Sequence, residues 1–318
     1  MRKMHALLTA LAVMIAMPAI ASEPPPVDPD GHEVVPLGDP ADDRVTIPIS
    51  IDGKGPWHFV IDTGAQRTVI SRALADKLAL VRGGVVTVLG MTGPAQADTV
   101  ALTQLGYGRS RIHDIEAPVL EGEHLGAAGL LGLDGLQSKR LLLDFRSGKM
   151  QISSSRRSAS SEDRIVVEAR RRRGQLILLN SEINGMPVNI ILDTGTNISV
   201  GNLALMNKLL ARKRLPRLVQ ASLTSVTGGT LTGQAGIVDS VRMGPVVLTN
   251  LGVMFADAAP FAELGLRDKP ALLLGINALK VFDRVAIDFI TAKVDFLLPD
   301  LGSIERRRYA EARLGGAG

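Results

Sequence analysis

The stretch WHFVIDTG at residues 57–64 is repeated as VNIILDTG at residues 188–195. In each stretch an apolar run leads into Asp-Thr-Gly, and the two aspartates, Asp62 and Asp193, are 131 residues apart. One Asp-Thr-Gly triplet is weak evidence, because such a triplet occurs by chance. Two triplets at equivalent places, each after an apolar run, indicate an internal repeat and therefore a duplicated fold.

Strand patterns precede both triplets. Residues 45–51 alternate apolar and polar side chains, which predicts a half-buried strand, and Asp52-Gly53 is a hairpin turn signal. The second copy has the apolar residues 176–179 and the turn signal Asn184-Gly185. We therefore expect each copy to open with a β-hairpin whose return strand ends at the aspartate.

The match continues after the triplets. Nine residues beyond each aspartate stands a helix N-cap candidate, Ser71 in the first copy and Asn202 in the second. A glycine-tipped hairpin is predicted next in each copy. The tip residues are Gly90, Met91, Thr92 and Gly93 in the first copy, and Thr227, Gly228 and Gly229 in the second.

Each copy ends in a similar way. An apolar pair stands before a glycine and is followed by a closing strand. These are Leu130-Leu131-Gly132 with residues 141–145, and Leu273-Leu274-Gly275 with residues 285–289. The spacing between the copies is 143 residues at these glycines, against 131 at the aspartates, so the second copy contains an insertion.

Composition excludes several kinds of chemistry. Hydrophobic residues make up 46% of the chain, which is typical of a globular protein, but aromatics are 3%, so the core must be aliphatic. The absence of Cys excludes disulfides, thiolate metal sites and cysteine nucleophiles. No G-x-S-x-G, P-loop, G-x-G-x-x-G or H-E-x-x-H pattern is present. We expect no cofactor and no metal.

The first 21 residues are predicted to be a signal peptide. Arg2 and Lys3 form a positive start, an apolar run follows, and a small-residue cleavage pattern ends at Ala21. This predicts a periplasmic or secreted protein, with an uncleaved membrane anchor as the alternative. Residues 22–43 are acidic and proline-rich, and we interpret them as a flexible lead-in, with a pro-segment as the other possibility.

The remaining boundaries follow from the repeat. We expect an N-terminal lobe at residues 44–153, a serine-rich linker at residues 154–163, a C-terminal lobe at residues 164–300 and a tail at residues 301–318. The formal charge of +4 includes two basic residues of the leader, and one Trp cannot form a stacking surface for bases. We therefore expect no nucleic-acid partner and interpret the basic run 170–173 as a solvated edge.

Two carboxylates on facing loops have a defined chemistry. A carboxylate on a tight turn after a buried strand is held against the backbone, and glycine permits the required geometry. If a two-fold arrangement brings Asp62 and Asp193 about 3 Å apart, both cannot ionise, and they share a proton. One then acts as a general base on water while the other donates a hydrogen bond to a substrate carbonyl.

Both triplets, both apolar-apolar-glycine motifs and their order resemble a single-chain bacterial aspartic protease of the retropepsin-like or pepsin-like kind, over about residues 44–300. The resemblance implies a mainly β fold of two acid-protease-type β-barrel lobes, each six-stranded, related by pseudo-two-fold symmetry with a cleft between them. Hairpin flaps would close over an extended peptide. The lobes are short and lack the flap tyrosine of pepsin-like enzymes, because Tyr107 lies too far past the first hairpin, so the chain looks more like a fused retropepsin dimer.

The resemblance also implies residue roles. Asp62 and Asp193 would be the catalytic dyad, and Thr63 and Thr194 the threonines that cross beneath it. The supporting set comprises Thr63, Gly64, Thr194, Gly195 and Thr196, and the seven tip residues named above would form the flaps. The residue three after the aspartate is Ala65 in one copy and Thr196 in the other. We expect the Thr196 hydroxyl to stabilise the ionised form of Asp193 and to leave the proton on Asp62.

The resulting hypothesis is an aspartic endopeptidase that acts on a peptide or protein substrate as a monomer. Two alternatives stay open. One is a non-catalytic periplasmic peptide-binding module of the same fold. The other is a lobe that pairs with another chain, which the repeat within one chain makes unnecessary.

Overall fold

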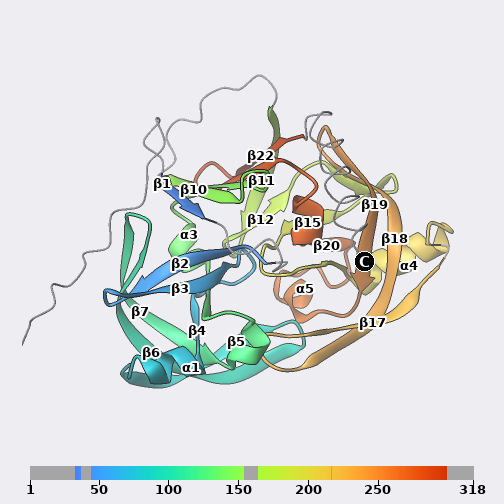
Figure 1. Ribbon diagram of the computed structural model, residues 1–318. Coiled ribbons are helices and arrows are strands. Elements are labelled where there is room, and N and C mark those ends of the chain that lie inside the picture. Colours follow the sequence, from blue (N-terminus) through green and yellow to red (C-terminus); the bar gives the residue numbers. More distant parts are fainter. Residues whose placement is uncertain (1–32, 37–43, 154–163, 216, 299–318) are drawn as a thin grey trace, which may run out of the picture.

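The computed structural model describes residues 33–36, 44–153, 164–215 and 217–298. This part of the chain is mainly β and forms two lobes, one from each copy of the repeat. In Figure 1 the first lobe, coloured blue to green, lies on the left, and the second, coloured yellow to red, lies on the right. The predicted signal peptide (1–21), linker (154–163) and tail (301–318), and most of the lead-in (22–43), lie outside the described residues.

Six strands close a barrel in the first lobe. In spatial order they are β2 (Thr46–Ile51), β3 (Lys54–Ile61), β8 (Gly129–Leu131), β4 (Val69–Ser71), β7 (Ser110–Leu120) and β6 (Gly93–Tyr107). The ring closes because β6 pairs with β2, and β5 (Arg82–Gly90) extends the sheet beyond β6. The predicted alternation is confirmed, since Ile47, Ile49 and Ile51 are all fully buried.

The second lobe repeats this ring with two strands broken in two. Its strands are β12 (Gln175–Leu178), β13 (Ser181–Ile183), β14 (Met186–Pro187), β15 (Asn189–Leu192), β16 (Ser199–Gly201), β17 (Val219–Thr224), β18 (Thr230–Met243), β19 (Val246–Phe255) and β20 (Ala271–Leu274). The segment equivalent to β2 is divided into β12, which pairs with β15, and β13, which pairs with β18. The same strand thus contacts both neighbours of the ring.

The predicted turns and helix starts are confirmed in both lobes. Asp52-Gly53 and Asn184-Gly185 have positive φ at both residues (48° and 76°, 48° and 73°), as a type I′ hairpin turn requires. Ser71 caps α1 (Arg72–Lys77) by accepting from the Leu74 amide at 3.2 Å. Asn202 caps α4 (Leu203–Ala211) in the same way, at 2.9 Å from the Leu205 amide.

The other helices of the described residues are short: α2 (Gly122–Leu125), α3 (Leu133–Leu136), α5 (Ala259–Glu263) and α6 (Ile276–Leu279). None of the helices that the structure describes is long and apolar enough to cross a membrane.

A sheet shared by the lobes forms the upper part of Figure 1. Its order is β1 (Glu33–Pro36), β10 (Lys149–Ser153), β9 (Arg140–Asp144), β21 (Arg284–Asp288), β22 (Lys293–Leu297) and β11 (Arg164–Arg172). The lobes join where β9 pairs with β21, and Arg284 Nε donates to an Asp144 oxygen across this junction at 2.7 Å. The first lobe is therefore not self-contained up to residue 153, because its last two strands belong to the shared sheet.

The structure also changes the predicted extent of the flexible lead-in at residues 22–43. Glu33–Pro36 form strand β1, which pairs antiparallel with β10. These four residues are thus part of the shared sheet and not of a flexible lead-in.

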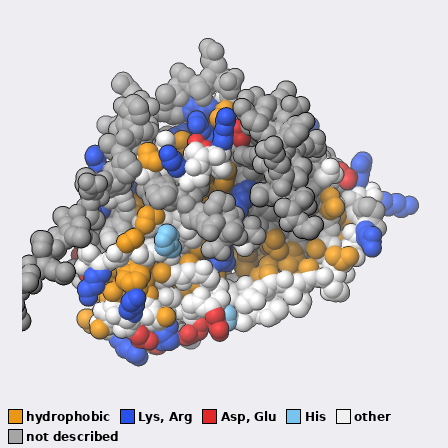
Figure 2. Space-filling view, viewed as in Figure 1, with side chains coloured by type: hydrophobic (Ala, Val, Ile, Leu, Met, Phe, Trp, Pro, Cys, Tyr) orange, Lys and Arg blue, Asp and Glu red, His pale blue; other side chains and the backbone are white. Residues whose placement is uncertain are grey.

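Basic side chains do not gather on one lobe in the view of Figure 2, which shows Lys and Arg spread over both. The basic run 170–173 lies on β11 and just beyond it. Arg170, Arg171 and Arg173 are exposed, and Arg173 forms an ion pair with Glu263 of the same chain. The exposure of these arginines agrees with the interpretation of a solvated edge.

The shared sheet predicts joint unfolding of the two lobes. Leu143 of β9 is fully buried, so Leu143→Ala should lower the free energy of unfolding by about 2–5 kcal/mol. Leu142→Ala, on the half-buried face of the same strand, is the matched control and should cost less than half as much. Fluorescence of the single Trp57, in the first lobe, and circular dichroism of the whole chain should give the same urea midpoint. Separate midpoints would show that the lobes unfold independently.

Candidate active site

Asp62 and Asp193 directly follow the ends of β3 and β15. The Asp62 amide donates to the Leu131 carbonyl at 3.0 Å, and the Asp193 amide donates to the Leu274 carbonyl at 3.1 Å. The apolar pair before each later glycine therefore has a structural function: its second residue, on β8 or β20, fixes the backbone of the aspartate.

The two aspartates face each other across the glycines of the triplets. A Cβ atom on Gly64 would lie 2.8 Å from the carboxyl carbon of Asp193, and a Cβ on Gly195 would overlap the carboxyl group of Asp62. Each glycine thus touches the carboxyl group of the other lobe. A larger residue at either position would force the loops apart.

The two threonines cross between the lobes beneath this contact. Thr63 Oγ1 donates to the Leu192 carbonyl at 3.0 Å, and Thr194 Oγ1 donates to the Ile61 carbonyl at 2.6 Å. Each hydroxyl also accepts from the main-chain amide of the other threonine, at 3.1 Å in both cases. Both side chains are buried, so these four hydrogen bonds satisfy groups that have no access to water.

Main-chain amides hold the carboxyl groups. Asp62 Oδ1 accepts from the amides of Gly64 (2.8 Å) and Ala65 (2.9 Å), and Asp193 Oδ1 accepts from the amide of Gly195 (3.0 Å). The expectation for Thr196 is corrected: its hydroxyl donates to the Ile198 carbonyl at 2.9 Å and not to Asp193. Thr196 acts on Asp193 only through its main-chain amide. The hydroxyl is hydrogen-bonded to this nearby main-chain carbonyl instead of to the carboxyl group.

The two carboxyl groups differ in the causes that shift their pKa values. Burial raises the pKa of Asp62, while the amides of Gly64 and Ala65 and the charge of Arg44 lower it. Burial and the charge of Asp62 together raise the pKa of Asp193 to about 7. The arrangement favours an ionised Asp62 beside a protonated Asp193, the opposite of the order expected from Thr196.

Sequence reasoning missed two residues beside the dyad, Arg44 and Gln175. Arg44 lies close enough to lower the pKa of both aspartates, and Gln175 Nε2 donates to the Gly64 carbonyl at 2.6 Å. Each stands 18 residues before the aspartate of its lobe. Extending the comparison of the two copies by one residue would have found the pair.

The predicted hairpin tips come together. The first turn lies between β5 and β6, and the second lies between β17 and β18. The Met91 amide donates to Ser225 Oγ at 3.0 Å, and the Ala259 amide donates to the Met91 carbonyl at 2.9 Å. A Cβ on Gly90 would overlap the Thr227 side chain, and a Cβ on Gly229 would lie 3.1 Å from Cβ of Thr92. We call this contact between the two tips the clasp.

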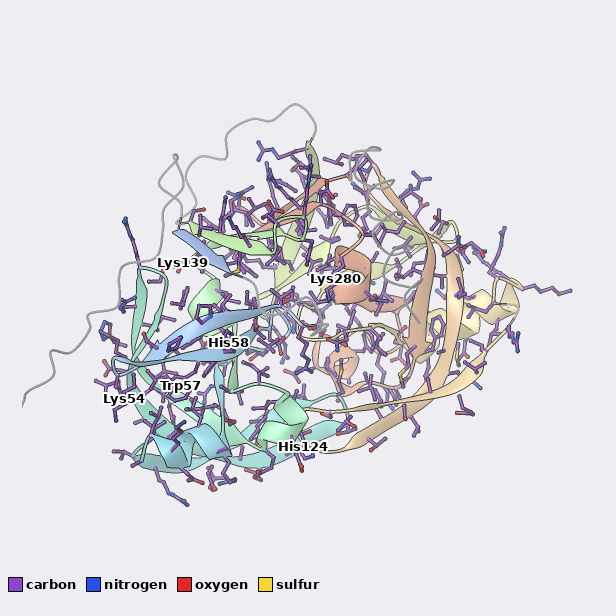
Figure 3. The ribbon with its side chains drawn as sticks, in the orientation of Figure 1. Lys54, Trp57, His58, His124, Lys139 and Lys280 are labelled. Atoms are coloured by element: carbon purple, nitrogen blue, oxygen red, sulfur yellow. The ribbon has the colours of Figure 1, made fainter. Side chains whose placement is uncertain are left out.

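Each tip also packs against the opposite lobe. Met91 contacts an apolar cluster of the second lobe, and Val226 contacts one of the first lobe. These clusters include Ile177, Leu231 and Phe261 in the second lobe and Val60, Leu120 and Leu125 in the first. Gly228 lies against the ring of His124 on α2, at the lower centre of Figure 3.

A cavity of about 230 Å³ lies beside the clasp, lined among others by Gln96, His124 and Thr227. Neither aspartate lines it. Among the residues that the structure describes, no group of three or more His, Asp or Glu side chains could hold a metal ion.

A comparison with known protein families gives a separate match for each lobe. Residues 47–138 match the family described as "gag-polyprotein putative aspartyl protease", and residues 179–278 match the family described as "Aspartyl protease". Each matched range contains one Asp-Thr-Gly loop. A search of curated proteins found no match to the chain.

The raised pKa of Asp193 predicts a pH-dependent stability. Because the folded-state pKa of about 7 exceeds the ordinary value of 3.8, the folded protein binds this proton more tightly than the unfolded chain does. The stabilisation is complete below the ordinary value and is lost as the pH rises to about 7. Between pH 4 and pH 8 the free energy of unfolding should therefore fall by up to about 4 kcal/mol more in wild type than in Asp193→Asn.

Urea unfolding at pH 4, 6 and 8 measures this difference. Asp114→Asn, at an exposed position, is the control and should follow wild type. Parallel curves for wild type and Asp193→Asn would contradict the assignment of a raised pKa.

The clasp predicts local opening when its hydrogen bond is removed. Ser225→Ala deprives the Met91 amide of its acceptor, and a hydrogen bond worth about 1 kcal/mol corresponds to about fivefold faster hydrogen exchange. Thr224→Ala, an exposed position on the same hairpin, should leave the exchange rate unchanged. An unaltered Met91 amide in Ser225→Ala would mean that the tips are held by packing alone.

Proposed function

Since the chain is a two-lobe, retropepsin-like aspartyl protease, we propose that it is an endopeptidase whose catalytic dyad is Asp62 and Asp193. The observation that carries this proposal is the contact of Gly64 and Gly195 with the opposite carboxyl groups. Such a close approach brings one carboxyl from each lobe into one site, as a shared proton requires.

The chemistry follows from the two protonation states. The Asp62 carboxylate accepts a proton from water as the water oxygen bonds to the peptide carbonyl carbon, and Asp193 gives its proton to the carbonyl oxygen. In the tetrahedral intermediate the C–N bond then breaks. The proton on Asp62 goes to the leaving nitrogen, and one hydroxyl proton of the intermediate returns to Asp193. The pair is restored, and the step needs no covalent intermediate.

The substrate we propose is an extended peptide or protein segment bound beneath the two hairpins, which act as flaps. The contacts of Gly90, Met91, Thr227 and Gly229 support this role, because two tips that touch each other must separate to admit a chain. We propose a monomer, because both aspartates come from one chain, and no nucleic-acid partner.

The location we propose is the periplasm or the exterior of the cell. This rests on residues 1–21, whose charged start, apolar run and small-residue end have the features of a cleaved signal peptide.

The test is cleavage of a peptide library by the mature chain from pH 3 to pH 8. Wild type should cut, and Asp62→Asn and Asp193→Asn should each lose at least about 10³-fold in kcat/KM, because a dyad acts as a unit. Asp114→Asn is the control for removal of a carboxylate elsewhere.

Two results would count against the proposal. Cleavage that survives in both Asn variants would assign the activity to other residues. Tight binding of peptides without any cleavage by folded wild type would favour the non-catalytic peptide-binding module.

A further inference from the structure

Arg44 occupies the position opposite Asp62 in the first lobe. The Ile61 amide donates to the Val45 carbonyl at 2.9 Å, which extends the ladder between β2 and β3 by one pair. One residue further along the two chains stand Arg44 and Asp62. Neighbours opposite each other on paired chains lie close enough for their side chains to interact.

Gln175 occupies the same position in the second lobe. Ile177 is paired with Ile191 between β12 and β15, and two residues further along stand Gln175 and Asp193. The duplicated fold therefore gives each aspartate one polar cross-strand neighbour, a cation in the first lobe and a neutral amide in the second.

The two neighbours are held in different ways. Arg44 Nη1 donates to the Leu125 carbonyl at the end of α2. Gln175 is 7% exposed and donates through Nε2 to the Gly64 carbonyl, and its Oε1 has no hydrogen-bond partner among the described residues. Opposite Asp62 a positive charge favours the anion, whereas opposite Asp193 the neutral Gln175 supplies no such charge.

A further carboxylate near the first loop is engaged elsewhere. On α3, Asp134 accepts from the amide and the hydroxyl of Thr68, at 2.9 and 2.7 Å. The equivalent residue on α6 is the neutral Asn277, which is hydrogen-bonded to Ser199 at 2.8 Å. Among the described residues, Arg44 is the cation whose charge lowers the pKa of both Asp62 and Asp193.

We propose that Arg44 is a positioning residue that holds the single negative charge of the pair on Asp62 and leaves the shared proton on Asp193, beside the neutral Gln175. Arg44 thereby assigns the base to the first lobe and the acid to the second. The consequence for catalysis rests on the proposed function, but the assignment of charge does not.

The direct test is a carboxyl-carbon NMR titration of the full chain with ¹³C-labelled aspartate. Asp62→Asn and Asp193→Asn identify the two resonances. In wild type Asp62 should ionise first. In Arg44→Gln both titration midpoints should move to higher pH, and that of Asp62 should move further, by on the order of one pH unit, because Asp62 loses the cation opposite it. Arg44→Lys keeps the charge and should restore both midpoints.

The pH profile of kcat/KM should shift in the same direction as the NMR midpoints. The acidic limb of kcat/KM reports ionisation of Asp62, and the basic limb reports loss of the proton from Asp193. Both limbs should move to higher pH in Arg44→Gln and stay in place in Arg267→Gln, which removes a cation at an exposed site. If wild type does not cleave peptides, the proposed function fails, but the NMR titration still tests the role of Arg44.

Three results would overturn the proposal. The first is unchanged midpoints in folded Arg44→Gln, and the second is an equal shift in Arg267→Gln. The third is Asp193 ionising first in wild type. If Arg44→Gln does not fold, Arg44→Met, which keeps an unbranched stem without the charge, provides the same comparison.

Discussion

The close approach of the half-buried Asp62 and the buried Asp193 is the constraint on which the rest of this structure depends. Moving a carboxylate out of water is unfavourable by several kcal/mol unless hydrogen bonds or a shared proton compensate. Here the main-chain amides after each aspartate supply the hydrogen bonds, and glycine at 64 and 195 leaves room for the opposite carboxyl group. The crossed threonines then fix the loops, because each hydroxyl joins the two lobes as donor and acceptor at once.

The lobes are also joined at two other places, and these differ in strength. At the junction, β9 and β21 form a continuous ladder whose inward side chains are buried. At the clasp, the tips meet through few hydrogen bonds and half-buried side chains such as Met91 and Val226. Local opening has its lowest free energy where few buried contacts are lost. A rigid junction on one side and an easily opened one on the other agree with the proposed function, in which the carboxyl groups stay fixed while the hairpin tips separate.

The local features of this fold and its two-lobe repeat could be predicted from the sequence, but the strand pairing between the lobes could not. The turns at 52–53 and 184–185, the caps Ser71 and Asn202 and the two loops follow from residue types that act over a few positions. The shared sheet was missed because alternation in residues 140–153 predicts strands but does not identify their partners. The Thr196 hydroxyl was misassigned because the Ile198 carbonyl, two residues away, competes for it. Arg44 and Gln175 were overlooked because strand patterning starts one residue after each of them.

The fusion of two copies explains how such differences between the lobes can persist. In a symmetric homodimer both loops have identical surroundings, so neither carboxyl group can be favoured as the base. A single chain can carry different residues at equivalent places, as it does with Arg44 and Gln175, Ala65 and Thr196, and Asp134 and Asn277. The threonines and glycines that keep the loops together are the same in both lobes, because their contacts are reciprocal. The residues that set the charge need not match, and in this chain they differ.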